Sequence, residues 1–193
     1  AARRIAASHV PKVGKVPGAP AEILFVSSWA FDEPIAEAIE ACRILKSRVI
    51  IHITGRVKPA YRALLAGAPE NFRPTGFLSD AEYFALMARC DAVMAITRRS
   101  CTLVCGAYEA IALGKPMVLG NAAALREYFD EGAVHTDSTF PDLVLRLDEL
   151  LTDLHAKREA VARLLTRRAP EWERRLEALE ASVDAAVAVL RRG

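Results

Sequence analysis

The spacing of hydrophobic residues from position 21 onward predicts short buried strands that alternate with helices. Runs of apolar residues with little polar interruption indicate strands that are covered on both faces. They occur at 22–27, 48–54, 71–75, 92–97, 117–119 and 133–136. Apolar residues at helical spacing predict helices between these strands, at 33–45, 58–66, 80–89, 105–113 and 123–129. Such alternation favours right-handed crossover connections and therefore a parallel sheet.

Capping and turn signals refine these boundaries. Asp32 is expected to cap the first helix, with Pro34 in its first turn. Ser79 and Glu82 have the spacing of a capping box at the start of the helix 80–89. The proline in 71–75 places that strand near an edge of the sheet. The expected fold class is α/β, a doubly wound and mostly parallel Rossmann-like sheet of six strands with helices on both faces, followed by C-terminal helices.

The C-terminal part of the chain has only helical periodicity. We expect helices at 141–154, 157–168 and 171–190, separated at Pro170. The last helix carries an apolar stripe for which the sheet domain offers no obvious partner. Its members are Trp172, Leu176, Leu179, Val183, Val187 and Leu190. Because the start of the chain is rich in proline and glycine, the predicted division is a linker at 1–20, a Rossmann-like domain at 21–169 and a C-terminal helix at 170–193.

The composition is that of a soluble globular protein. The chain has 193 residues, of which 52% are hydrophobic and 26% charged, and its net charge is +2. This balance gives no sign of a surface that coats nucleic acid. No apolar run approaches the ~20 residues that span a bilayer, and the first residues lack the apolar segment of a signal peptide. We therefore expect a cytoplasmic location.

Cysteine usage fits a reducing compartment. Cys42 and Cys90 fall on apolar helix faces and are expected to be reduced core residues. Cys101 and Cys105 lack the C-x-x-C redox spacing and have no histidine nearby, so the sequence predicts no metal site.

Five further residues carry individual expectations. His52 lies within a predicted strand and is expected to be a hydrogen-bonded core residue. Trp29 and Phe31 are expected to be exposed aromatic residues of a loop at the ligand rim. Lys115 follows the predicted end of the helix 105–113, where a cation complements the helix dipole. Asn121 ends a strand on the same rim as the loop aromatics.

The stretch 97–121 carries the most specific chemistry. A strand ends there in a basic loop, and a helix begins near Cys105. Ligands of doubly wound sheets bind at the carboxyl ends of the strands, and the free N–H groups of a helix N-terminus suit phosphate. Glu109, on the first turns of that helix, is placed to accept hydrogen bonds from ribose hydroxyls next to the phosphate. The stretch therefore predicts a nucleotide site.

Residues 22 to about 190 resemble the C-terminal, donor-binding half of GT-B glycosyltransferases of group 1. The segments that carry the resemblance, in the family's order, are Thr75–Asp80 (TGFLSD), Phe84–Val93 (FALMARCDAV), Glu109–Val118 (EAIALGKPMV) and Pro170–Arg174 (PEWER). They are similar to the loop before the sugar-base helix, the L-x-x-A-D-A-x-V segment, the E-A-x-A-x-G-x-P-V-V signature and the opening of the final helix. In the family, that final helix crosses back to the N-terminal domain.

The resemblance implies roles for individual residues. Glu109 matches the second acid of the family's E-x7-E motif, which holds the donor ribose. The helix start that cradles the diphosphate and the loop before it correspond to Cys101, Thr102, Val104, Cys105 and Gly106. The loop whose backbone brackets the nucleobase corresponds to Gly76, Phe77 and Leu78. No cofactor is implied beyond a nucleoside diphosphate sugar, UDP- or GDP-linked, and no metal.

Departures from the family pattern concern the transferred sugar and the phosphates. Cys101 stands where the family has its first acid, eight residues before Glu109. The loop 27–33 lacks the basic residues that neutralise the leaving diphosphate, and Ser27 and Ser28 are its candidates for donor contact. Arg98 and Arg99 are predicted to supply the charge, because an arginine fork suits phosphate, and they are the candidate catalytic residues.

The expected function is that of the nucleotide-sugar-binding half of a hexosyltransferase in polysaccharide biosynthesis, with a glycan or lipid-linked acceptor. Its expected partners are an N-terminal acceptor domain outside this chain, a membrane surface for the full enzyme, and a second copy through the C-terminal helix, but not nucleic acid. Two alternatives stay open. One is a non-catalytic interaction domain with a decayed pocket, and the other is a nucleotide-sugar epimerase of the same architecture.

Overall fold

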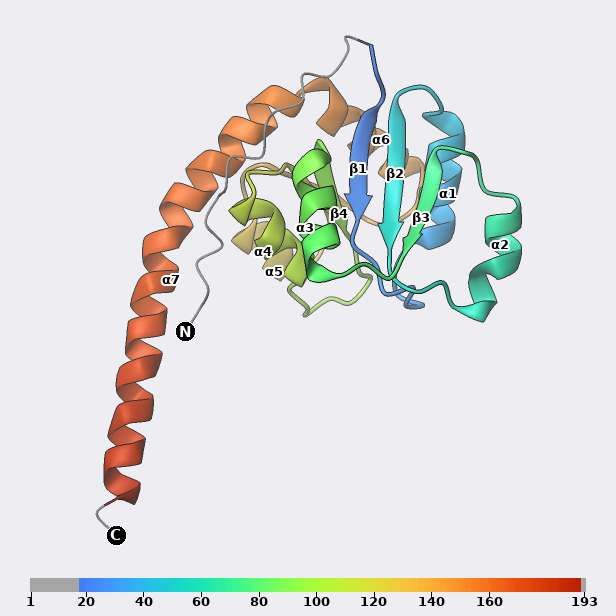
Figure 1. The fold of residues 1–193 in the computed structure, drawn as a ribbon. Coiled ribbons are helices and arrows are strands. Elements are labelled where there is room, and N and C mark those ends of the chain that lie inside the picture. Colours follow the sequence, from blue (N-terminus) through green and yellow to red (C-terminus); the bar gives the residue numbers. More distant parts are fainter. Residues whose placement is uncertain (1–17, 192–193) are drawn as a thin grey trace.

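The computed structural model describes residues 18–191, which form an α/β unit followed by a long helix (Figure 1). The sheet has six strands, all parallel, in the order β3-β2-β1-β4-β5-β6. The strands are β1 (Ala21–Phe25), β2 (Val49–Thr54), β3 (Phe72–Gly76), β4 (Ala92–Ala95), β5 (Met117–Gly120) and β6 (Ala133–Thr136). The prediction of a doubly wound, parallel, six-stranded sheet is confirmed.

Helices cover both faces of the sheet (Figure 1). On one face lie α1 (Ile35–Ile44) and α6 (Phe140–Thr152), and α2 (Arg62–Ala66) packs at its margin after the short 3-10 turn Pro59–Tyr61. On the other face lie α3 (Asp80–Arg89), α4 (Cys105–Ala112), α5 (Ala123–Tyr128) and the first part of α7 (Leu154–Leu190). Each face therefore has its own apolar layer.

The strands fill both layers because their side chains alternate between the faces. In β1, Ile23 and Phe25 join the layer under α1 and α6, while Leu24 joins the layer under α3 and α4. All three side chains are fully buried. Burial on both faces explains why these strands have unbroken apolar sequences rather than alternating ones.

Local signals at two segment ends are confirmed and one is not. β3 lies at an edge of the sheet, as Pro74 predicts. Ser79 and Glu82 form the predicted capping box, in which the Ser79 N–H donates to Glu82 Oε2 at 2.8 Å. The predicted capping of α1 by Asp32 is wrong, because α1 begins only after Pro34 and the Asp32 carboxylate accepts a hydrogen bond from Thr97 instead.

The predicted break at Pro170 is also wrong. Pro170 lies inside α7, which continues as one helix from Leu154 to Leu190. A proline removes one backbone hydrogen bond of a helix and crowds the preceding turn. Here, side chains on both sides of Pro170 form hydrogen bonds with the same residue, Tyr128. The Arg168 guanidinium donates to the Tyr128 carbonyl at 3.2 Å, and the Trp172 indole donates to the Tyr128 hydroxyl. These contacts hold the helix on both sides of Pro170 against the same part of the domain.

Beyond Trp172, α7 extends away from the sheet (Figure 1). Its apolar side chains in this part are exposed, namely Leu176, Leu179, Val183, Val187 and Leu190. No helix within residues 18–191 combines the length and the apolarity that a membrane crossing requires. Most of the predicted linker 1–20 lies outside the described residues, and the domain boundaries at 21–169 and 170–193 stay predictions.

Candidate functional site

The order of the strands reverses between β1 and β4. From β1 the chain proceeds to β2 and β3 on one side, and from β4 to β5 and β6 on the other. Ligands of doubly wound sheets bind outside the carboxyl ends of the strands at such a reversal. The loops that follow β1 and β4 meet there, and the Arg98 N–H donates to the Asp32 carbonyl oxygen at 2.9 Å. This point is therefore the first place to look for a site.

The N-terminus of α4 packs against the end of β1. Val104 is the N-cap residue in an extended conformation, and no side chain caps the helix. Gly106 permits the close approach, since a Cβ at this position would lie only 3.1 Å from Val26 Cβ and Cγ2. The first N–H groups of a helix have no partner within it. The start of α4 therefore presents N–H groups and a positive dipole end to an anion at this rim.

Glu109 lies about one turn further along α4 and is half-buried. Tyr83 of α3 donates a hydrogen bond from its hydroxyl to Glu109 Oε2. Burial raises the pKa of Tyr83 well above its usual value of 10.0, and the neighbouring Glu109 carboxylate adds to that effect, so the hydroxyl remains a donor. An ionised carboxylate accepts about four hydrogen bonds. Glu109 is thus oriented by Tyr83 and keeps capacity for hydroxyl groups of a ligand.

The loop after β1 closes around the carboxylate of Glu33. This carboxylate accepts hydrogen bonds from the Ser27 hydroxyl at 2.5 Å, the Ser28 N–H at 3.0 Å and the Ala30 N–H at 3.1 Å. The Ser28 hydroxyl also donates to Glu33, at 3.1 Å. The two predicted donor-binding serines therefore lie at the expected rim, directly after Val26, but their hydroxyls are directed to an acid of their own loop.

Trp29 of the same loop is a core residue, so the expectation of an exposed aromatic is wrong for it. Its side chain is 0% exposed, and its indole N–H donates to the carbonyl oxygens of Thr54 at 2.9 Å and Gly55 at 3.1 Å. A left-handed backbone, with φ of 58°, turns the ring inward. Phe31 is 84% exposed, as predicted.

The two candidate catalytic arginines are held in ion pairs with carboxylates of the β1–α1 region. Arg98 Nη2 lies 2.6 Å from Glu37 Oε1, and Arg99 Nε lies 3.0 Å from Asp32 Oδ2. Both guanidinium groups remain partly exposed. The loop that carries them lines a hollow of about 320 Å³ together with the predicted rim residue Asn121 and with 136–138 after β6.

The pairing of Asp32 makes stability depend on pH in a defined direction. The hydrogen bond from Thr97 holds the pKa of Asp32 below its usual value of 3.8, and the Arg99 charge acts in the same sense. A carboxyl whose pKa is lowered in the folded state stabilises that state above its unfolded pKa and loses the effect as the pH falls through the folded pKa. We therefore expect wild type to exceed Asp32→Asn in unfolding free energy at pH 7, with the difference shrinking below about pH 4.

Urea unfolding at pH 7 and pH 3 measures this difference. Asp184→Asn, at an exposed position in the far part of α7, is the control and should stay within about 0.5 kcal/mol of wild type at both pH values. An Asp32→Asn difference that is the same at both pH values contradicts the assignment.

The loop after β3 lies two strands away from β1 along the sheet. Gly76 has φ of 74° and pairs with Gly55 in an isolated bridge, where the Gly55 N–H donates to the Gly76 carbonyl at 3.0 Å. Phe77 is exposed, with the Arg56 guanidinium 6.0 Å from its ring centroid, and Leu78 is half-buried. The capping box then starts α3, which carries Tyr83. The predicted base loop is thus connected to Glu109 through one helix.

Other predicted residues have plainer surroundings. Cys101 is exposed, with its Sγ 3.7 Å from the Ser100 hydroxyl, and Thr102 is half-buried. Lys115 does act at a helix end, but at that of α3, where its Nζ donates to the carbonyls of Ala88 and of Cys90. Sequence reasoning did not identify Tyr83 or Glu33 as site residues. The available signal in the sequence for Tyr83 was its position one turn after the Ser79 cap.

Comparison with known proteins assigns the sequence to a family. Residues 20–166 match the family described as Glycosyl transferases group 1. Comparison with curated proteins gave no significant match. Among solved structures, Anabaena HepE in complex with UDP is similar with a TM-score of 0.68 and 18% identity, over 84% of this chain and 49% of that one.

Two other solved structures show the same fold. The catalytic domain of cholesterol-α-glucosyltransferase from Helicobacter pylori gives a TM-score of 0.60 at 16% identity, over 78% of this chain and 99% of that one. The pneumococcal O-GlcNAc transferase GtfA, in complex with UDP and GlcNAc, gives a TM-score of 0.59 at 14% identity, over 82% of this chain and 36% of that one. This chain thus spans about half or less of HepE and GtfA. The match of the family to most of the sequence identifies the chain as a member of the group 1 glycosyltransferases.

Proposed function

We propose that this chain is the donor-binding half of an enzyme that transfers a hexose from a nucleoside diphosphate sugar to a glycan or a lipid-linked acceptor. The observation that carries the proposal is the uncapped start of α4 beside the end of β1, with Glu109 one turn away and oriented by Tyr83. Family membership supports it, as does the description of HepE in complexes with UDP and UDP-glucose.

In this proposal each part of the donor has its own group. The N–H groups of Val104, Cys105 and Gly106 receive the diphosphate. Glu109 accepts hydrogen bonds from the ribose hydroxyls, and the loop of Gly76, Phe77 and Leu78 brackets the base. Departure of the nucleoside diphosphate builds negative charge on its phosphates, and preorganised N–H donors stabilise that charge.

The proposed role of Arg98 and Arg99 is to add positive charge to the same phosphates. Their side chains are 39% and 60% exposed, and the ion pairs with Glu37 and Asp32 hold them at the rim. The Arg98–Glu37 pair is partly exposed, and such pairs contribute only about 0–1 kcal/mol, so exchanging this carboxylate for a diphosphate is energetically accessible. The Asp32 side chain is only 11% exposed, so the release of Arg99 from it costs more. Ser27 and Ser28 similarly have to leave Glu33 before their hydroxyls can donate hydrogen bonds to the phosphates.

The rest of the enzyme belongs to the proposal as well. An N-terminal domain would supply the acceptor site and any general base, so we expect this chain alone to bind nucleotide and to turn over poorly. A cytoplasmic location, peripheral contact of the full enzyme with a membrane, and contact of the exposed face of α7 with that domain or a second copy are further parts of it.

Nucleotide affinity tests the proposal. Titration calorimetry with UDP, GDP and ADP should show that one of them binds, and Glu109→Ala should weaken its binding about 10- to 100-fold, because the ribose loses a charged acceptor. Glu127→Ala, at an exposed acid on α5, is the matched control and should leave the affinity unchanged. Equal affinities of wild type and Glu109→Ala count against the site.

A second candidate function has its own supporting observation. The Glu33 carboxylate occupies the loop that in the family faces the diphosphate, and Cys101 replaces the acid that addresses the sugar. Both features fit an interaction domain that has lost catalysis. The calorimetry separates the two functions, because the interaction domain predicts no binding of any of the three nucleotides.

A further inference from the structure

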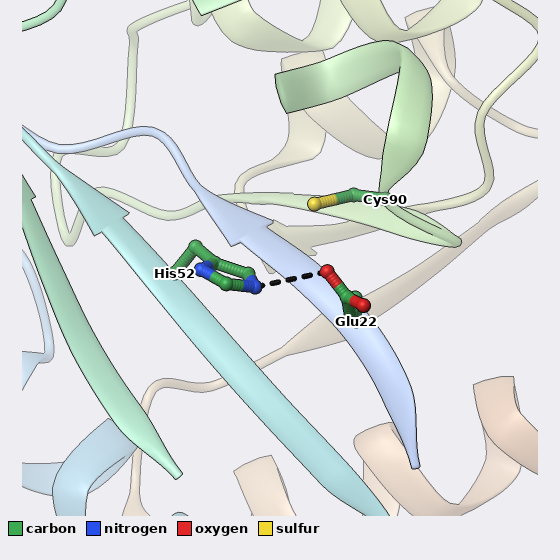
Figure 2. Close-up of side chains that lie close together, drawn as sticks. All are labelled: Glu22, His52 and Cys90. Atoms are coloured by element: carbon green, nitrogen blue, oxygen red, sulfur yellow. Dashed lines mark hydrogen bonds and ion pairs between the residues drawn. The ribbon is translucent and has the colours of Figure 1, made fainter. Parts of the chain in front are cut away.

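A group of three different ligand types, with His52 and Cys90 buried and Glu22 half-buried, lies away from the nucleotide rim. Glu22, His52 and Cys90 each direct one ligand atom toward the others, and these atoms all lie within 4.8 Å of one another (Figure 2). His52 Nε2 is 3.0 Å from Glu22 Oε2. Within residues 18–191 this is the one group of three or more histidine, cysteine and acidic side chains with such proximity. The proposed donor chemistry uses none of them.

Sheet register and one helix end bring the group together. Glu22 and Leu24 share a face of β1, and Leu24 is the partner of His52 in β2. The side chains of Glu22 and His52 therefore lie on the face covered by α3 and α4. Cys90 is the C-cap residue of α3 and ends the helix over that face. Its sulfur points toward the pair in Figure 2.

Backbone contacts fix Cys90 next to Glu22. The Asp91 N–H donates to the Glu22 carbonyl at 2.7 Å, and the Glu22 N–H donates to Asp91 Oδ2 at 2.9 Å. The Lys115 ammonium binds the Cys90 carbonyl at 2.7 Å. The backbone of Cys90 is therefore fixed beside Glu22, while the thiol can still adjust by rotation of its side chain.

We propose that Glu22, His52 and Cys90 form a zinc-class metal site that ties the end of α3 to β1 and β2. Thiolate, imidazole and carboxylate together are a donor set for zinc, whereas magnesium and calcium prefer oxygen ligands. Zinc bonds of about 2.0–2.3 Å place tetrahedral ligand atoms roughly 3.3–3.8 Å apart, so Cys90 Sγ has to move by about 1 Å. A water molecule completes the fourth position.

Charge favours a divalent ion in this group. One Zn²⁺, one carboxylate, one thiolate and one neutral imidazole sum to zero, which suits a site with little access to water. Binding of the ion displaces the thiol proton of Cys90, which leaves to the solvent.

Arg89 is the cation that competes with a metal ion for Glu22. Its Nε lies 3.5 Å from Glu22 Oε2, while its side chain is 60% exposed. The arginine can therefore swing outward when an ion binds to Glu22. Removing it should strengthen metal binding about two- to fivefold, the effect of losing one exposed competing charge.

Cobalt(II) is the probe, because tetrahedral Co²⁺ absorbs visible light and a cobalt–thiolate bond adds a charge-transfer band. The 193-residue chain, reduced and free of metal, is titrated with Co²⁺ and then with Zn²⁺. We expect both absorptions to appear at one equivalent and to be removed by Zn²⁺. Cys90→Ser should remove the thiolate band and weaken Co²⁺ binding on the order of 100-fold.

Two control variants assign the sulfur. Cys42→Ser removes the other buried thiol, on the opposite face of the sheet, and should leave the titration unchanged. Cys101→Ser/Cys105→Ser removes the two exposed thiols and should also leave it unchanged. A thiolate band that is absent from wild type, survives in Cys90→Ser, or disappears in the double variant overturns the proposal.

Arg89→Ala keeps the test decisive if Cys90→Ser fails to fold. This exposed position tolerates truncation, and the expected gain of about two- to fivefold in Co²⁺ affinity cannot arise from unfolding. Unchanged or weaker binding in Arg89→Ala overturns the proposed ligand role of Glu22.

Discussion

Replacement of Trp29 by alanine is expected to lower the free energy of unfolding by about 3–5 kcal/mol, the range for removal of a large buried aromatic side chain. The indole is 0% exposed, packs edge-on against Tyr61 with ring centroids 5.5 Å apart, and donates to the Thr54 carbonyl. The change leaves a cavity and removes the donor from a buried backbone carbonyl. Urea unfolding followed by circular dichroism measures the loss.

Phe31→Ala is the matched control for Trp29→Ala. It removes an aromatic ring from the same loop, but one that is 84% exposed, and should change stability by no more than about 0.5 kcal/mol. Trp29→Phe serves if Trp29→Ala does not fold. It keeps most of the volume, loses the indole hydrogen bonds and should cost about 1–3 kcal/mol. Equal effects of Trp29→Ala and Phe31→Ala would falsify the role of Trp29 as the core anchor of this loop.

The same substitution connects stability to the proposed site. Trp29 lies between Ser28 and Ala30, whose N–H groups both donate to Glu33. Loss of the anchor should release this loop from the rim at the end of β1. Nucleotide binding by Trp29→Ala, measured under conditions in which the variant is folded, is therefore expected to be weaker than in wild type. Phe31→Ala is the control, because it removes the exposed ring at the rim and leaves the Trp29 anchor in place.

The strand and helix order was predictable because burial on both faces leaves a local trace in the sequence. A strand such as β1 has to be apolar at successive positions, since Ile23, Leu24 and Phe25 face two different layers. The capping box of α3 is equally local. Such features need no knowledge of distant residues, and the sheet prediction is confirmed for that reason.

The errors concern residues whose environment is set by distant partners. The sequence neighbours of Trp29 place it in a loop, and contacts with distant residues make it a core residue, namely the carbonyls of Thr54 and Gly55 and the ring of Tyr61. Asp32 has the residue type of an N-cap, but its carboxylate accepts a hydrogen bond from Thr97, which lies in the loop after β4. Pro170 remains inside α7 because Arg168 and Trp172 hold Tyr128. In each case a tertiary contact overrides a local preference.

The candidate site also has one part that the sequence predicts and another that depends on distant residues. The start of α4 and Glu109 follow each other in the chain, so strand–loop–helix order alone predicts their position. Partners from other segments, such as Tyr83 for Glu109 and Glu33 for the serines, require the folded structure. Glu22, His52 and Cys90 belong to three different elements, and their spacing in the sequence does not predict that they lie together.

Gly132→Ala is the second substitution with a large expected effect, about 2–5 kcal/mol. Gly132, in the turn before β6, has φ of 71°, which costs a residue with a Cβ about 1–2 kcal/mol. A Cβ there would also lie 2.2 Å from Val161 Cγ2 and 2.8 Å from the Val161 backbone nitrogen in α7. Overpacking of this kind adds about 1–3 kcal/mol, because either the turn or α7 has to move.

Gly114→Ala separates the two contributions. Gly114 also has a left-handed backbone, with φ of 64°, but a Cβ at this position would lie more than 4 Å from every described residue other than its neighbours in the chain. It should therefore cost only the backbone part, about 1–2 kcal/mol. Because Val161 belongs to the part of α7 that covers the sheet, the excess cost of Gly132→Ala, read from urea unfolding of both variants, measures how tightly α7 is seated. If the two variants are equally destabilised, α7 yields freely at Val161 and is only loosely attached to the domain.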